Sequence, residues 1–145
     1  MININYPEPG FRIKEEAGKE LIFDALRKKW LQLTPEEWVR QNFVQYLLQE
    51  KKYPLSLIAI EKEIRLGELK KRFDILVYDN NHQPWMMIEC KAASIKLDDT
   101  VLQQILRYNI TVPVPFIIIT NGSLTYGWQR KDNNLDLITE IPGWK

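Results

Sequence analysis

The sequence predicts an α/β (α+β) fold in which a mixed central β-sheet is flanked by helices. Three observations support it. A strong helix start occurs at Thr34, two apolar strands that each contain charged residues are joined by turn formers, and a fully apolar strand follows a second helix. The expected order is α-β-β-β-α-β, with a β-hairpin before it and further strands after it. The 145 residues, 45% of them hydrophobic, match a single domain over 1–145 with an irregular leader over 1–10.

The N-terminal part predicts a hairpin and a helix. Two short apolar runs between Phe11 and Phe23 flank a glycine-containing segment, which is typical of a β-hairpin. Thr34 can cap a helix, Pro35 suits its first position, and Glu37 completes a capping box. The helix is expected to run to about Lys51.

One face of this helix is expected to pack on the core, because apolar residues recur on it at spacings of three and four. These residues are Val39, Phe43, Tyr46 and Leu47. Glu36 lies at the upper end of the face, so its carboxylate is expected to point inward. Glu37 competes for this position, but the capping box already gives it a structural role, and Glu36 is preferred.

Three strands follow the helix. Ser56 to Leu66 alternates in polarity, and Arg72 to Tyr78 and Trp85 to Ala92 form the next two. The turn-forming segment 79–84 joins the last two, which predicts an antiparallel hairpin.

A second helix is expected to begin at Asp98 or Asp99 and to stop before Pro113. Its apolar stripe comprises Val101, Leu102, Ile105, Leu106 and Tyr108. Phe116 to Thr120 has no polar alternation, so it predicts a strand buried on both faces and a right-handed β-α-β crossover at the centre of the sheet. Two shorter strands, around 124–130 and 135–141, are expected to close the fold as a hairpin.

Composition excludes several classes of site. The single cysteine, Cys90, and the single histidine, His82, exclude an internal disulfide, a cysteine-rich zinc site and a two-histidine site, so any metal must be held by carboxylates. No stretch reaches the roughly 18 apolar residues of a membrane span, and the first residues do not resemble a signal peptide, so no membrane contact and a cytoplasmic location are expected. The net charge of +1 means that nucleic-acid binding would need a local basic patch.

Three charged residues interrupt the central strands: Asp74, Glu89 and Lys91. Glu89 and Lys91 are two residues apart, so their side chains share a face with α-carbons about 7 Å apart. A simple ion pair with Lys91 would account for one acid and leave the other over. A divalent cation such as Mg²⁺ relieves the repulsion between two converging carboxylates, so the charge count favours a metal site.

These residues carry a family resemblance. Asp74, fourteen intervening residues and Glu89-Cys90-Lys91 resemble the core motif of the PD-(D/E)xK nucleases. Gln104 and Tyr108 match the Gln-x-x-x-Tyr motif on the following helix, and Glu36 lies where this superfamily often places a further acid. The resemblance implies a restriction-endonuclease-like fold.

The likeness spans nearly the whole chain and is greatest to the N-terminal nuclease domain of type I restriction enzyme R (motor) subunits, in a small stand-alone form. The stretches that carry it include 22–24, 27–30, 34–41 and 120–122. Phe73 replaces the proline before Asp74, as in many superfamily members. The sequence has no Gly-rich phosphate-binding loop, so ATP-driven restriction by this chain alone is not expected.

The resemblance implies a role for each site residue. Asp74 and Glu89 would hold Mg²⁺ or Mn²⁺, with the Cys90 carbonyl as a backbone ligand. Lys91 would orient or help deprotonate the attacking water. Glu36 would bind the metal through water or position Lys91, or it would merely complement the helix dipole.

Further residues are candidates for DNA contact. Gln104 and Tyr108 would line the cleft, or they are a rim polar residue and a core tyrosine of an ordinary helix. Lys71 and Arg72 belong to a short basic run that could meet phosphates, although such runs more often form a solvated surface. The Cys90 side chain should face away from Glu89 as a buried apolar filler.

The expected function is a divalent-metal-dependent endonuclease that hydrolyses DNA. The alternative is a catalytically weak or inactive nucleic-acid-binding or structural module of a restriction or repair assembly. Expected partners are DNA and other restriction-system subunits, and cutting both strands would call for a homodimer or two encounters.

Overall fold

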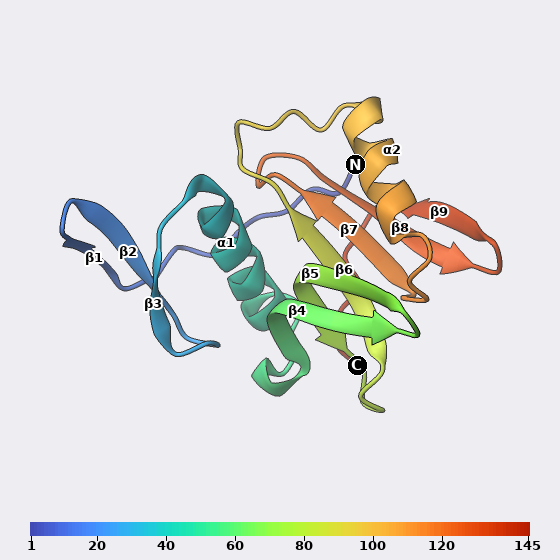
Figure 1. The fold of residues 1–145 in the computed structure, drawn as a ribbon, viewed down its shortest axis with the longest axis horizontal. Coiled ribbons are helices and arrows are strands. Elements are labelled where there is room, and N and C mark those ends of the chain that lie inside the picture. The colour runs from blue at the N-terminus through green and yellow to red at the C-terminus, as the bar shows by residue number, and fades with distance from the viewer.

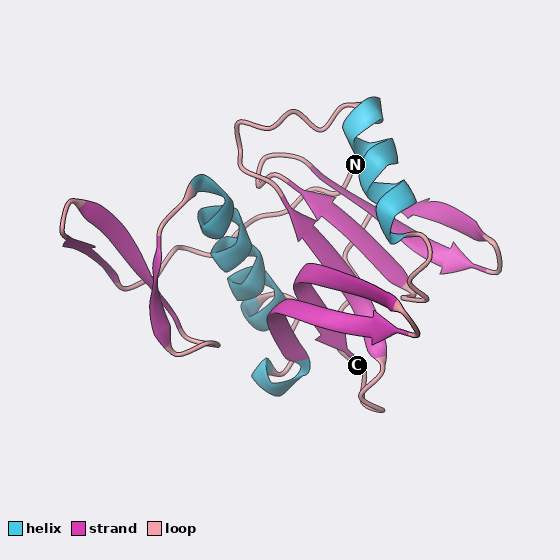
Figure 2. Cartoon of the chain, viewed as in Figure 1, coloured by secondary structure: helices cyan, strands magenta, loops and turns pink.

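Two β-sheets and two α-helices form the structure (Figure 1, Figure 2). The computed structural model describes the backbone of residues 1–145 and every side chain except that of Leu66. In chain order the elements are β1 (Ile13–Glu16), β2 (Lys19–Asp24), β3 (Lys29–Gln32), α1 (Pro35–Gln49), a 3-10 turn (Leu55–Leu57), β4 (Ile58–Leu66), β5 (Leu69–Tyr78), β6 (Pro84–Cys90), α2 (Asp99–Asn109), β7 (Phe116–Thr120), β8 (Thr125–Lys131) and β9 (Asn134–Ile138). The predicted order α-β-β-β-α-β and the mixed sheet are confirmed.

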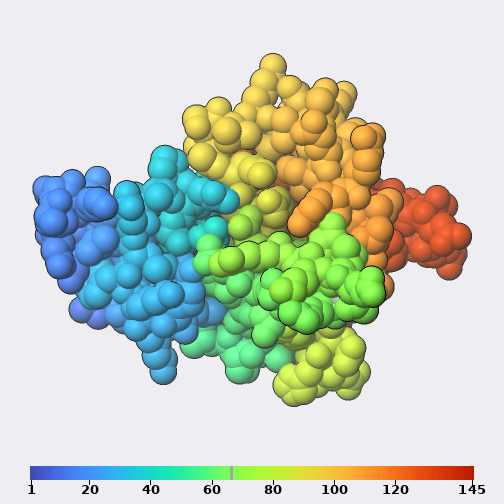
Figure 3. All heavy atoms as spheres, viewed as in Figure 1, coloured from blue at the N-terminus to red at the C-terminus, as the bar shows by residue number. Residues whose placement is uncertain are grey.

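The N-terminal sheet contains one strand more than the sequence predicts. β1 and β2 form the expected antiparallel hairpin around Ala17 and Gly18, both with positive φ. β3 then pairs with β2, and the rings of Phe23 and Trp30 pack edge to face across the two strands with centroids 5.4 Å apart. The sequence of β3, Lys-Trp-Leu-Gln, does not alternate in polarity, so the sequence pattern did not predict this strand. This sheet and the β8–β9 hairpin form opposite ends of the molecule (Figure 3).

Helix α1 begins as predicted. The Thr34 hydroxyl accepts a hydrogen bond from the Glu37 N–H at 3.0 Å, and Pro35 occupies the first helical position. The helix ends at Gln49, two residues before the predicted end, and its predicted apolar face is buried. α1 lies between the N-terminal sheet and the larger sheet (Figure 1).

The six-stranded sheet has the order β4-β5-β6-β7-β8-β9. β4, β5 and β6 pair antiparallel, whereas β6 and β7 pair parallel and are connected through α2. All five residues of β7 are buried, which confirms the prediction of a central strand. β4 begins at Ile58 rather than Ser56, because a 3-10 turn precedes it.

Two hydrophobic cores cover the two faces of this sheet. The core beneath α1 includes Phe43, Ile75 and Ile88, and the core beneath α2 includes Leu76 and Ile105. Ile75 and Leu76 are adjacent on β5, so the strand contributes alternate side chains to the two cores. Asp74, which precedes Ile75 on β5, therefore lies in a strand that is packed on both faces.

The leader contains no helix or strand, but its second residue, Ile2, is packed into the core. The N–H of Ile2 donates to the Thr125 carbonyl at 2.8 Å, and the Ile2 side chain is buried. None of the helices among the described residues is both long and apolar enough to cross a bilayer.

Gly127 of β8 marks the closest packing in this region. A Cβ at this position would lie 2.8 Å from the Cδ1 atoms of Ile118 and Ile2 and 2.9 Å from Cγ1 of Ile138. We expect Gly127→Ala to lower the free energy of unfolding by about 1–3 kcal/mol, because three side chains would have to move together. Chemical denaturation would measure the change. The control is Gly10→Ala, where an added Cβ meets nothing within 4 Å; equal effects in the two variants would contradict the packing argument.

Candidate active site

Asp74 lies where the backbone pairing between β5 and β6 stops. The last paired residues are Ile75 and Ile88. Beyond this pair, the Asp74 side chain replaces the backbone as hydrogen-bond acceptor, since its Oδ2 accepts a hydrogen bond from the Cys90 N–H at 2.7 Å. The side chain is thus fixed against the end of β6, beside Glu89.

The pairing of β5 is also interrupted on its other side, at Glu61 of β4. Glu61 lies opposite Asp74 in the register and has a φ of 52°, in the left-handed region that side chains rarely adopt. Phe73 and Ile75 flank Asp74 and belong to different cores, although residues two apart on a regular strand share a face. The regular alternation of side chains between the two faces of β5 is therefore interrupted at Asp74.

Glu89 and Lys91 meet at the end of β6, as their spacing predicts. The Lys91 Nζ lies 3.5 Å from Glu89 Oε1, and the two side chains are 35% and 22% exposed. Burial and then the charge of Asp74 raise the pKa of Glu89 to about 7, while Lys91 opposes the shift. The Asp74 carboxylate, bonded to the Cys90 N–H, therefore lies close enough to Glu89 for its charge to act on that acid.

Glu36 lies at the rim of this cluster, with 46% of its side chain exposed. Burial and then Asp74 raise its pKa, and Arg40 and Lys91 oppose the rise. Glu36 thus feels the same charges as Glu89. Its side chain is about half exposed to solvent, so the expectation that its carboxylate points into the core is wrong.

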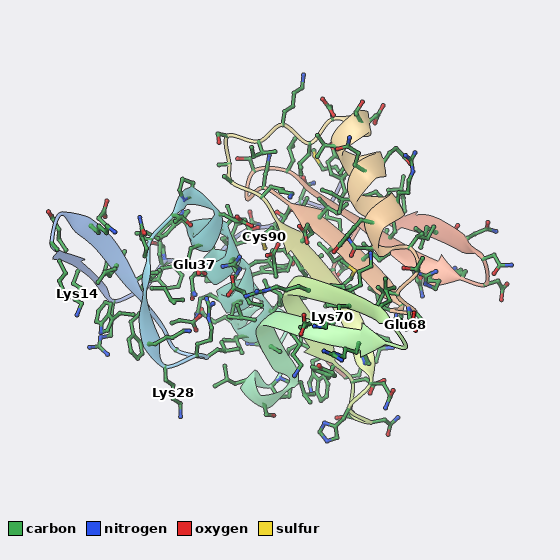
Figure 4. The ribbon with its side chains drawn as sticks, viewed as in Figure 1. Lys14, Lys28, Glu37, Glu68, Lys70 and Cys90 are labelled. Atoms are coloured by element: carbon green, nitrogen blue, oxygen red, sulfur yellow. The ribbon has the colours of Figure 1, made fainter. Side chains whose placement is uncertain are left out.

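Glu37 is the buried acid of the first turn, which corrects the preference for Glu36 as the inward carboxylate. Thr34 caps its N–H, but the Glu37 carboxylate accepts from Arg27 at 3.0 Å, Arg40 at 2.9 Å and Gln41 at 3.2 Å. Burying this acid is possible because two guanidinium groups compensate it. Figure 4 labels Glu37 on α1 and Cys90 at the end of β6.

Arg40 is a candidate site residue that the sequence analysis missed. Its Nη2 donates to Asp74 Oδ1 at 3.1 Å and its Nη1 to Glu37, and only 6% of the residue is exposed. Burial disfavours the charged form, but Glu37 and Asp74 outweigh it and raise the pKa of Arg40. The spacing of Arg40 from Glu36 and Glu37, four and three residues along a helix, was the available signal.

The side chain of Cys90 is buried in the core beneath α1, on the face opposite Glu89, as predicted. Burial raises the pKa of its thiol well above the ordinary value, so it is an apolar filler at neutral pH. The structure ties its N–H to the site; a role for its carbonyl stays a prediction.

The two α2 residues lie outside the cluster. Gln104 and Tyr108 are exposed, Tyr108 by 56%, so the expectation that Tyr108 belongs to the apolar stripe is wrong. The buried residues of α2 are Leu102, Ile105, Leu106 and Asn109, and Tyr108 lies off the helix face that these spacings define. The Lys71 Nζ lies 3.3 Å from the centre of the Tyr108 ring and donates to the Tyr108 carbonyl. Among the described contacts, neither α2 residue reaches the acids of β5 and β6.

The two basic candidates differ in accessibility. Lys71 is only 7% exposed, so a phosphate would have to compete with its bond to the Tyr108 carbonyl. The Arg72 side chain is 67% exposed and pairs with Glu61 at 3.1 Å. Of the two, Arg72 is the one that solvent reaches.

The donor set fits a hard divalent cation with few protein ligands. Among the described residues, no three His, Cys, Asp or Glu side chains form a metal-binding group. Asp74 and Glu89 do converge, and Mg²⁺ commonly takes one or two carboxylates and completes its shell with water. Hence the pair suits Mg²⁺ or Mn²⁺ better than it suits a fully protein-coordinated ion.

A family model for the N terminus of the type I restriction enzyme R protein matches residues 35–142. The chain belongs to this family. The matched range of the R-protein family begins with α1 and extends past β9, so it includes every candidate site residue and leaves β1, β2 and β3 outside. No curated protein matches the chain.

The metal-free protein should become less stable relative to Glu89→Gln as pH rises. Glu89 is protonated below its ordinary pKa of 4.5 in both folded and unfolded states, and its folded-state pKa is about 7. Ionisation of the folded protein is therefore disfavoured between these values, and the difference in unfolding free energy should reach on the order of 2–3 kcal/mol above pH 7. Urea denaturation in EDTA from pH 4 to 8 would measure it. A difference that does not change with pH would contradict the shifted pKa.

Proposed function

We propose that this chain is a divalent-metal-dependent endonuclease that hydrolyses the phosphodiester bonds of DNA. The observation that supports the proposal is the convergence of Asp74 and Glu89 beside Lys91, at a point where both neighbouring strand pairings are interrupted. A partly buried pair of acids is costly unless a cation compensates it. Membership of the R-protein family is consistent with a nuclease.

Asp74 and Glu89 would hold Mg²⁺ or Mn²⁺, with the Cys90 carbonyl as a third oxygen. The ion would supply Lewis-acid activation of the phosphate and a lowered pKa of its bound water. Asp74 is positioned for this task by its bond to the Cys90 N–H. Glu89 would contribute in its ionised form, which a bound cation favours.

Lys91 would contact the reacting groups directly. Its ammonium lies 3.5 Å from Glu89 and is 35% exposed, so it is accessible from solvent. In this position it would orient the attacking water or stabilise charge on the phosphate. Glu36, at the exposed rim, would act through water molecules.

The DNA would approach from the side where Lys91 and Glu36 are exposed. Arg72, Gln104 and Tyr108 are exposed and stay candidates for contacts with it. Other restriction-system subunits are further proposed partners, and a homodimer is one way to cut both strands.

The second candidate function is a binding module with weak or no turnover. The observation in its favour is the Arg40–Asp74 ion pair, because an arginine already compensates one of the two acids. In that case the chain would hold DNA or another subunit without a bound metal.

Cleavage of supercoiled and single-stranded DNA by the purified chain, with Mg²⁺ and with Mn²⁺, would separate the two. We expect metal-dependent nicking that falls at least about 100-fold in Lys91→Ala and Asp74→Asn, because both remove groups that act on the transition state. Lys70→Ala is the matched control, since Lys70 is exposed near the β4–β5 turn (Figure 4). Its nicking rate should stay within about twofold of the unmodified chain.

A chain that binds DNA equally well in all variants and cleaves with neither metal would favour the binding module. Nicking that survives both substitutions would point to a contaminating nuclease.

A further inference from the structure

Arg40 is surrounded by four carboxylates. Its Nη1 is bonded to Glu37 at 2.9 Å, whereas its Nη2 lies 3.1 Å from Asp74, 3.7 Å from Glu61 and 3.8 Å from Glu36. Only 6% of Arg40 is exposed, so these acids, rather than water, form its surroundings. One nitrogen therefore has three acceptors within reach, and a small rotation would exchange one for another.

Both oxygens of Asp74 are already bonded in this arrangement. Oδ2 accepts from the Cys90 N–H at 2.7 Å and Oδ1 from Arg40 at 3.1 Å. A divalent cation on Asp74 would lie within a few ångströms of the guanidinium, and two cations at that distance repel strongly in a partly buried site. Metal binding and the Arg40–Asp74 bond therefore oppose each other.

Glu61 offers Arg40 an alternative position. Its Oε2 is bonded to Arg27 at 3.2 Å and Arg72 at 3.1 Å, and its Oε1 faces Arg40 at 3.7 Å. The residue adopts a φ of 52°, which costs a non-glycine residue energy, and both Glu61 Oε1 and Asp74 Oδ1 lie within reach of Arg40 Nη2. The Nε of Arg40 is buried without a hydrogen-bond partner among the described residues, so the present position is not its optimal one.

We propose that Arg40 is a positioning residue that works as an internal counter-ion. In the metal-free protein it neutralises Asp74, and when a divalent cation binds, Nη2 turns to Glu61 while Nη1 stays on Glu37. The inference rests on the proposed function only in taking Asp74 and Glu89 as the metal-binding acids. Its tests measure metal binding, which is separate from cleavage.

The first test is calorimetric titration of the metal-free variants with Mg²⁺. Removing the competing charge in Arg40→Gln should tighten binding roughly tenfold, since Coulomb repulsion at a few ångströms is lost. Arg40→Lys keeps the charge and should stay closer to the unmodified protein. Lys62→Gln is the matched control, because Lys62 is an exposed cation of β4, and its affinity should change less than about twofold. Unchanged or weaker binding in a folded Arg40→Gln would overturn the proposal.

The second test separates a specific acceptor from the general field of the acids. Glu61→Gln removes the proposed alternative acceptor and should weaken Mg²⁺ binding about fivefold or more. Glu63→Gln removes the same charge from an exposed position two residues along β4. Equal weakening in the two variants would show only a field effect and would overturn the role of Glu61.

The third test needs no substitution at Arg40, so it is decisive even where Arg40→Gln fails to fold. The guanidinium NMR signals of Arg40 should shift during a Mg²⁺ titration of the unmodified protein, with the midpoint found by calorimetry. Signals that do not move as the metal binds would overturn the proposal. A chain that follows this binding pattern but cleaves no DNA would refute the nuclease and leave the counter-ion in place.

Discussion

The hydrogen bond from the Cys90 N–H to Asp74 Oδ2 determines where the candidate site forms. It ends the ladder between β5 and β6 and fixes a carboxylate at the point where a backbone bond would otherwise continue the sheet. Glu89 and Lys91 then project beside it from the end of β6. Apolar cores cover both faces of the sheet, whereas the side chains of Glu89 and Lys91 at this interruption are partly exposed to solvent.

Elements with strong local signals were predictable from sequence. Thr34 and Pro35 fixed the start of α1, the apolar run from Phe116 to Thr120 identified the central strand, and the spacing of Glu89 and Lys91 placed them on one face. Each of these rests on contacts within a few residues or on the period of a single element. The predicted antiparallel hairpin placed Asp74 on the strand next to them, and the register that brings it to the end of β6 comes from the structure.

The rest of the site depends on pairings between residues far apart in the chain, which a single sequence does not reveal. From the sequence, Arg40 resembles any solvent-exposed helix residue, but in the structure β5 places Asp74 against it. Glu61 likewise resembles an ordinary strand residue, but its backbone adopts a positive φ. Tertiary contacts override the local pattern at both positions. Tyr108 is different, because the local spacing of the buried residues Leu102, Ile105, Leu106 and Asn109 already places it off the buried face of α2.

The N-terminal sheet shares charges with the site although it precedes the range that defines the family. Arg27, in the turn after β2, bonds both Glu37 and Glu61, the two acids on either side of Arg40. A fragment cut at the start of α1 would keep these acids and lose one of the cations that hold them. The structural unit of this protein is therefore larger than the range by which its family is recognised, and Arg27 belongs to the electrostatics of the candidate site.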